Sequence, residues 1–260
     1  MIRDYYRSNS DTNATCEFMK PQLLRFNDIH KNIPLWDYHI HTTITDGTSS
    51  FEEYIQTGIN RGLQAIVFTE HVRKTSLWYP EFIESVEGSR ESYKQKINIF
   101  HGIETKILNV DGELDATDDM LDTAELVLGS VHRFPGLSST PAISNYNLSE
   151  DQFAKIELEL AKEILKNPDV DVLAHPGGMF MRKFKKNVPA GFIEDLIGVA
   201  NRHDRAIEIN SSYLKDISLD TEPFSQMNPL ISLGSDAHNK DELGDIIQFM
   251  KKIIETGYHD

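Results

Sequence analysis

The sequence contains one cysteine and lacks the features that mark membrane-spanning or secreted proteins. Cys16 has no partner for an internal disulfide, so metal ligands would be nitrogen and oxygen donors, and a cytoplasmic location is expected. No apolar stretch approaches the roughly 20 residues that a membrane-spanning helix needs. The polar segment 1–20 also lacks the apolar core of a signal peptide.

Linkers and internal repeats are absent as well. The 260 residues contain no segment rich in proline or glycine that would separate domains. A chain of this length with 39% hydrophobic residues can bury one large core, which predicts a single domain. We interpret residues 1–34 as an N-terminal extension, with a short helix around 22–29, and residues 35–260 as the domain.

Basic residues are scarce. The chain has 26 Lys and Arg against 41 Asp and Glu, a formal charge of −15. Such a surface repels nucleic acid and argues against a general DNA or RNA binder. It does not exclude an anionic substrate, because bound divalent ions can dominate the local field of a site.

What the sequence does contain is a series of apolar, strand-like runs that end at metal-ligand residue types. The first run ends in His39 and His41, and because strand side chains alternate, both imidazoles should point the same way, as in half of a metal site. Seven such runs are predicted, at residues 36–41, 65–69, 97–103, 126–131, 170–174, 206–209 and 230–235. The polar residues at or just after their ends are His39, His41, His71, Glu104, His132, His175, Asn210, Asp236 and His238.

Segments with helical spacing of apolar residues lie between and after these runs, at 50–62, 150–166, 189–203 and 240–256. Alternating strands and helices predict parallel strands joined by crossover helices. Functional groups at successive strand ends are typical of the catalytic face of a β/α barrel. Seven strands predict a distorted barrel, in which His39 and His238 meet at one mouth although they are far apart in the sequence.

The chain resembles the PHP family (polymerase and histidinol phosphatase), and histidinol phosphatases in particular. The resemblance rests on six motifs in order: His39-x-His41-Thr42 with Asp46-Gly47, Thr69-Glu70-His71, Gly102-Ile103-Glu104, Gly129-Ser130-Val131-His132, Ala174-His175-Pro176 and Ser235-Asp236-Ala237-His238. It implies an α/β fold, a distorted seven-stranded (β/α)7 barrel of PHP type, and metal-dependent phosphoesterase activity.

Carried over residue by residue, the resemblance implies three metal sites that share nine residues: His39, His41, Glu104 and Asp236 at a first ion, Glu104, His132 and His175 at a second, and Asp46, His71 and His238 at a third. Many histidinol phosphatases have a histidine where this chain has Asp46 or Gly47, which changes the donor set of the third site. Six imidazoles and three carboxylates without a thiolate suit Zn, Mn or Fe better than Ca or Mg, so two to three such ions are expected.

The residues expected to act on the substrate are fewer. Arg182 lies in a segment similar to the one in which histidinol phosphatases hold the substrate phosphate, and Arg133 and Arg73 are alternatives. Glu104, Asp236 and Arg182 are the catalytic candidates, with a metal-bridging hydroxide as the nucleophile. Glu70 and Glu208 are either partners that orient ligand histidines or salt-bridged strand residues.

These patterns predict a hydrolase that releases phosphate from a small phosphorylated metabolite, such as histidinol phosphate or a sugar or nucleoside phosphate. A phosphodiesterase or exonuclease of the same family is the first alternative, and a non-catalytic PHP scaffold is another. A metal amidohydrolase is disfavoured, because no lysine stands at a strand end for carbamylation. No nucleic acid or membrane partner is expected.

Overall fold

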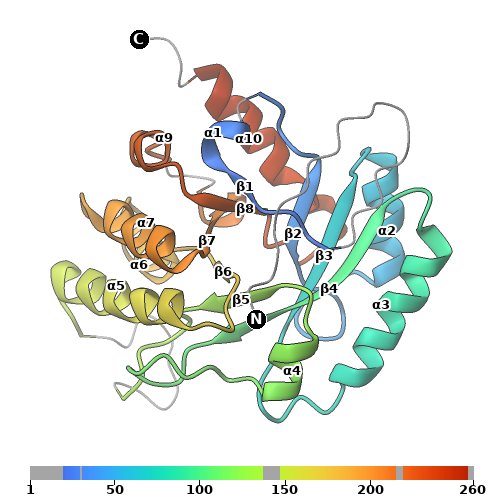
Figure 1. The fold of residues 1–260 in the computed structure, drawn as a ribbon, viewed down its shortest axis with the longest axis horizontal. Helices are drawn as coiled ribbons and strands as arrows, with labels where there is room; N and C mark the ends of the chain where they lie inside the picture. The colour runs from blue at the N-terminus through green and yellow to red at the C-terminus, as the bar shows by residue number, and fades with distance from the viewer. Residues whose placement is uncertain (1–19, 30, 137–146, 215–218, 257–260) are drawn as a thin grey trace.

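The computed structural model describes residues 20–29, 31–136, 147–214 and 219–256. Its centre is one curled sheet of eight strands in the order β1-β8-β7-β6-β5-β4-β3-β2 (Figure 1). The seven predicted runs form parallel neighbours: β2 (Trp36–Ile40), β3 (Ala65–His71), β4 (Asn98–Lys106), β5 (Val127–Ser130), β6 (Val172–Leu173), β7 (Ala206–Asn210) and β8 (Leu230–Gly234).

The eighth strand corrects the predicted count of seven. β1 (Leu24–Arg25) runs antiparallel to the start of β8, and the helix expected at 22–29 is reduced to α1 (Phe26–Ile29). The two ends of the parallel sheet meet through an isolated bridge between Ile40 and Ala237. The first residues of β8 therefore keep a free edge, and β1 pairs with it.

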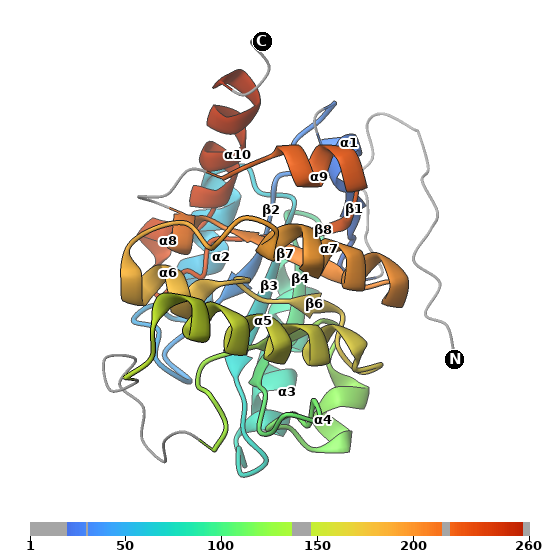
Figure 2. The same cartoon turned by 90° about the vertical axis from the view of Figure 1, so that its left-hand side faces the viewer.

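Helices cover the outside of the curl (Figures 1 and 2). α2 (Phe51–Asn60) and α3 (Tyr79–Tyr93) lie on the side of β2 to β4, and α5 (Glu150–Lys166) and α7 (Phe192–His203) lie on the opposite side. Shorter helices are α4 (Asp118–Thr123), α6 (Gly178–Phe184), α8 (Ser211–Leu214) and α9 (Glu222–Met227). The predicted helix at 240–256 is interrupted: a 3₁₀ turn (Lys240–Glu242) is followed by α10 (Asp245–Thr256), because Gly244 between them has a φ of 77°.

Two apolar layers support the sheet. The larger lies between the strands and the helices, and the smaller consists of residues in or beside the strands, such as Trp36, Tyr38 and Val67, so it fills the inside of the curl. Towards the carboxyl ends of the strands the interior becomes polar. This change places the predicted ligand residues in one buried region above an apolar floor.

Residues 1–19, most of the predicted N-terminal extension, lie outside the described residues, so the boundary at residue 34 stays a prediction. The described part of that segment belongs to the fold, since Phe26 packs on Phe224 of α9 with ring centroids 5.3 Å apart. Across the described ranges, no helix is both long and apolar enough to cross a membrane.

Candidate metal centre

A register irregularity in β2 accompanies the inward orientation of His39. The pairing of β2 with β3 shifts between Asp37 and Ile40, and the change of side explains why Tyr38 joins the inner apolar layer while His39 also faces the interior. His39 and His41 then meet, with their Nε2 atoms 3.1 Å apart. The prediction that both imidazoles point to one place therefore agrees with the structure.

Donor atoms of four residues gather at the centre of the cluster. His39 Nε2 and His41 Nε2 lie 3.5 and 3.3 Å from Asp236 Oδ1, and 3.4 and 3.5 Å from Glu104 Oε2. Two donors that each lie about 2.1 Å from one tetrahedral ion are about 3.4 Å from each other. The donors of His39, His41 and Asp236 lie close enough together to hold a small divalent ion, Glu104 Oε2 adjoins the two imidazoles, and all four residues are buried.

The other oxygen of Glu104 serves a second group. Glu104 Oε1 lies 2.8 Å from His175 Nε2 and 3.0 Å from His132 Nε2, and these two nitrogens are 3.4 Å apart. One buried carboxylate thus contacts two separate sets of imidazoles. This arrangement suits a bridge between two ions, as the resemblance implies.

The third predicted set is more open. Asp46 Oδ2 lies 3.4 Å from His71 Nε2 and Asp46 Oδ1 lies 3.5 Å from His238 Nε2, while the Asp46 side chain is 55% exposed. Hydrogen bonds from His238 and His71 hold the pKa of Asp46 below its ordinary range. His71 also reaches inward, with Nδ1 2.8 Å from Glu104 Oε2, so the third set adjoins the other two.

Two buried glutamates have different roles. Glu208 accepts from His39 Nδ1 at 2.7 Å, which turns the opposite ring nitrogen towards the centre, and it also accepts from the His175 backbone N–H at 2.6 Å. Within the described residues, Glu70 makes no hydrogen bond to a ligand imidazole. It accepts hydrogen bonds from Thr42 N at 2.8 Å and from the Thr45 hydroxyl. Glu70 therefore fixes the loop that carries Asp46.

Backbone geometry is unusual where two ligand residues leave their strands. His175 has a φ of 29° and Asp236 a φ of 53°, values that residues other than glycine seldom adopt. The Glu208 carboxylate also approaches β8 so closely that a Cβ on Gly234 would lie 2.2 Å from Glu208 Oε1 and 2.6 Å from His39 Cβ. The surrounding structure thus enforces unusual backbone conformations at His175 and Asp236 and leaves room only for glycine at position 234.

The imidazoles differ in proton affinity although they are neighbours. Burial alone would lower the pKa of His39, but Glu208 and other carboxylates hold it well above its ordinary value. Burial would also lower the pKa of His71, but the neighbouring carboxylates of Glu104 and Asp46 raise it to about 10. Burial dominates at His41 and lowers its pKa to about 4.

The neighbouring imidazoles in turn lower the pKa values of the buried carboxylates. Burial would raise the pKa of Glu104, yet His132 and its neighbours hold it well below the ordinary value, and His39 does the same for Asp236. Protons retained on some imidazoles therefore balance the buried negative charge. Divalent ions could supply that positive charge in place of the protons, so the residues fit a metal cluster.

Comparison with known proteins identifies the family. The model of the PHP domain matches residues 37–212. The chain belongs to the PHP domain family.

The relatives of the chain differ in length. A probable phosphatase of Thermoanaerobacter sp. (strain X514) is 27% identical over 85% of this chain and 86% of its own length. The DNA polymerase/3'-5' exonuclease PolX of Bacillus subtilis is 28% identical over 81% of this chain, which spans 35% of PolX. Among solved structures, histidinol phosphate phosphatase of Lactococcus lactis, complexed with Zn, L-histidinol and phosphate, has a TM-score of 0.67 at 18% identity, covering 86% of this chain and 94% of that one.

The structure separates the three arginine candidates of this PHP domain. Arg182, on α6, lines a cavity of about 290 Å³ together with His71, His132 and Asp236 of the metal centre. Neither Arg133 nor Arg73 is among the described residues that line it. Their predicted role in substrate binding gains no support from the geometry.

The sequence reasoning missed Tyr213. Its ring stacks on His175 with centroids 4.6 Å apart, and the Arg182 guanidinium lies 4.3 Å from its centre. Gly178 gives it room, since a Cβ there would lie 2.6 Å from the Tyr213 ring. Tyr213 follows the predicted strand end at Asn210 by three residues, which was the signal that could have drawn attention to it.

Proposed function

We propose that the protein is a metal-dependent phosphomonoesterase that acts on a small phosphorylated metabolite. The observation that supports this best is the cluster of buried imidazole and carboxylate donors, with Glu104, His132, His175 and Asp236 lining a cavity that also contains Arg182. Curated relatives that match most of the chain bear the name probable phosphatase, and the Lactococcus histidinol phosphatase was solved with zinc and phosphate.

The metal ligands would be the nine predicted residues in their three sets. When bound, zinc, manganese or iron would supply Lewis-acid charge and an activated water as the nucleophile. Three divalent ions would bring six positive charges against three carboxylates, so the cavity would favour an anion.

The chain's own residues would bind and orient the phosphate. The Arg182 guanidinium can donate two parallel hydrogen bonds to non-bridging oxygens, a geometry that planar guanidinium groups favour. Stacking on Tyr213 restricts the guanidinium to one plane, and Arg182 Nη2 lies 3.9 Å from Asp236 Oδ2. A monoester carries more charge than a diester, so this extra cation favours monoesters.

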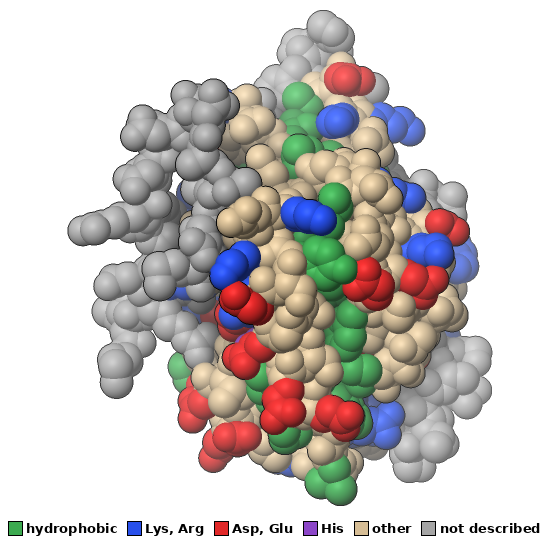
Figure 3. All heavy atoms as spheres, turned by 90° about the vertical axis from the view of Figure 1, so that its right-hand side faces the viewer, with side chains coloured by type: hydrophobic (Ala, Val, Ile, Leu, Met, Phe, Trp, Pro, Cys, Tyr) green, Lys and Arg blue, Asp and Glu red, His purple; other side chains and the backbone are tan. Residues whose placement is uncertain are grey.

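The phosphodiesterase alternative keeps one supporting observation, the similarity to PolX. Nucleic acid would need a basic track beside the cavity. On the face that carries α2 and α3, acidic side chains gather over the lower part, and most of the Lys and Arg side chains lie above them (Figure 3). With a net charge of −15, this surface favours a small substrate.

The test is metal analysis of purified protein followed by a phosphate-release screen. Monoesters, diesters such as bis(p-nitrophenyl) phosphate, DNA ends and amides should be compared after loading with Zn, Mn or Fe. We expect monoesters to have the highest kcat/KM. A preference for diesters or DNA ends would replace the proposal with the phosphodiesterase alternative.

A further inference from the structure

A carboxyl group that is not among the nine predicted ligands is buried between α5 and α6. Glu157 is 1% exposed and lies on the face of α5 that also carries Phe153 and Leu160. Its two oxygens accept hydrogen bonds from the backbone N–H groups of Met179 at 2.9 Å and Phe180 at 2.8 Å. A leucine would fill the same space without burying a polar group, so this carboxyl group indicates a more specific role than packing.

These two bonds hold the start of α6, the seven-residue helix that carries Arg182. Gly177 precedes the helix with a φ of 76° and offers no side chain to cap it. The N–H of Gly178 donates to His175 O at 2.9 Å, and the next two N–H groups are the ones that Glu157 accepts. A helix this short is not stable by itself. Glu157 therefore supplies, from a neighbouring helix, the cap that the local sequence lacks.

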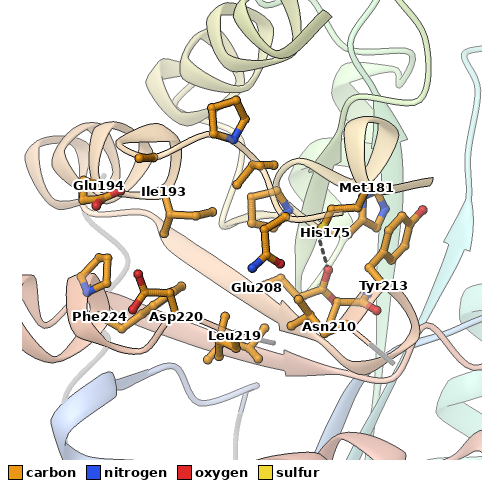
Figure 4. A pocket seen from close by; sticks show the side chains of 18 residues that line it. His175, Met181, Ile193, Glu194, Glu208, Asn210, Tyr213, Leu219, Asp220 and Phe224 are labelled. Carbon is orange, nitrogen blue, oxygen red and sulfur yellow. Dashed lines mark hydrogen bonds between the residues drawn. The ribbon is translucent and has the colours of Figure 1, made fainter. Parts of the chain in front are cut away.

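Packing secures α6 incompletely, because the helix borders two cavities. Arg182 lines the cavity at the metal centre, which we call the metal-side cavity, and Met181 lines a second cavity of about 290 Å³ (Figure 4). Atoms at a cavity wall lack packing partners on that side. The remaining apolar contacts, such as Phe180 with Phe153 at ring centroids 6.4 Å apart, are non-directional. Hydrogen bonds to two consecutive N–H groups, in contrast, fix the rotation and the height of the helix.

Contacts of the Arg182 side chain with the described residues do not fix its position. The side chain is 52% exposed, and Nη2 lies 3.9 Å from Asp236 Oδ2, which is too far for a hydrogen bond. The Tyr213 ring restricts the plane of the guanidinium but does not set the place of the Arg182 backbone. Arg182 follows Phe180 by two residues on the same short helix. Its reach into the metal-side cavity therefore depends on where Glu157 holds α6.

We propose that Glu157 is a positioning residue for phosphate binding: it holds the start of α6 and so places the Arg182 guanidinium at the metal-side cavity. This inference rests on the proposed phosphomonoesterase function. His175, which precedes α6, is held separately, since its backbone N–H donates to Glu208 at 2.6 Å (Figure 4). Loss of the Glu157 bonds should therefore impair the phosphate site and leave the metals bound.

The experiment replaces Glu157 by leucine, which has a similar size but accepts no hydrogen bond, and by glutamine, which keeps one acceptor oxygen. We expect Glu157→Leu to keep the metals and to lower kcat/KM for p-nitrophenyl phosphate by about 10- to 100-fold, because small misplacements of a binding group have effects of this size. The loss for bis(p-nitrophenyl) phosphate should be much smaller. Glu157→Gln should lie between Glu157→Leu and the wild type.

Thr117→Ala is the matched control. It removes the side-chain cap of α4, a short helix with no residue among the described walls of either cavity. This change should leave kcat/KM for both esters unchanged in the folded protein. An effect confined to the Glu157 variants would therefore not arise from the loss of a helix cap in general.

A double-mutant cycle with Arg182→Ala separates positioning from a general effect on folding. If Glu157 acts through Arg182, adding Glu157→Leu to Arg182→Ala should change kcat/KM by less than about twofold. If Glu157→Leu does not fold, Glu157→Gln is used in the same cycle, and its smaller loss should likewise disappear in the Arg182→Ala background.

Four results would overturn the proposal: a full further loss in the double variant, an equal loss for monoester and diester, loss of metal from Glu157→Leu, or unchanged activity of Glu157→Leu. Each of these leaves the phosphatase function of the wild type intact. Failure of the metal-loaded wild type to hydrolyse any ester would instead refute the phosphatase function on which the inference rests.

Discussion

Glu104 contacts both inner groups of imidazoles, and Glu104→Gln tests the metal centre most directly. Its two oxygens lie 2.8 to 3.5 Å from nitrogens of His39, His41, His71, His132 and His175. The substitution keeps the shape of the side chain but removes one negative charge from two ion sites. It also leaves an amide N–H₂ group facing imidazole nitrogens.

The size of the effect follows from the contacts. Losing a partner that only orients a ligand typically lowers metal affinity by about 10- to 100-fold. Glu104 would be a direct ligand shared by two sites, so we expect a loss of at least about 100-fold, or about 2.7 kcal/mol, at each. Metal content and turnover should fall together.

The assay is metal stoichiometry by mass spectrometry, together with affinity by chelator competition and kcat/KM on a monoester. Glu208→Gln should have an intermediate effect, because Glu208 would not be a metal ligand itself but accepts from His39 Nδ1 and from the His175 backbone N–H. Glu125→Gln is the control, a partly buried carboxylate that pairs with Arg90 away from the cluster. Full metal content with near wild-type turnover in Glu104→Gln would refute the bridging role.

Three further predictions concern the phosphate site, the metals and stability. Arg182→Ala should keep the metals and lower kcat/KM for a monoester by about 2 to 4 kcal/mol of transition-state stabilisation, with a smaller effect on a diester; unchanged monoester hydrolysis would show that the assignment is wrong. Chelation should abolish activity, and adding Zn, Mn or Fe should restore it; activity that survives exhaustive chelation would indicate an amino-acid nucleophile. As pH increases, kcat/KM should rise through an apparent pKa of about 7. Burial raises the pKa of Glu157, which accepts from the backbone of Met179 and Phe180 in α6, to about 8. The folded state keeps a proton that the unfolded chain loses, so the free energy of unfolding should fall between about pH 5 and pH 8 by up to about 1.4 kcal/mol per unit; denaturant titrations should show this slope reduced in Glu157→Gln, and an equal slope in both proteins would count against it.

The sequence by itself determined the parallel strands and the residues that gather at their ends. These features are local, because apolar runs set the strands and the ligand types follow each run directly. Parallel strands must bring their carboxyl ends to one edge, so convergence of distant residues such as His39 and His238 could be predicted without coordinates. The helix α3 was missed, because its amphipathic pattern is weak.

Tertiary structure alone decided how those side chains are aimed and what surrounds them. The register shift in β2 and the positive φ of His175 and Asp236 arise from packing and pairing between distant segments. β1 forms because the closing bridge leaves one strand edge free, which no local pattern encodes. Arg182 lines the metal-side cavity because α6 packs beside Tyr213, whereas Arg73 and Arg133 are not among the described lining residues. Neighbouring residues specify which donors are present, but contacts between segments far apart in the chain fix the direction of these donors, their proton affinity and the cavity beside them.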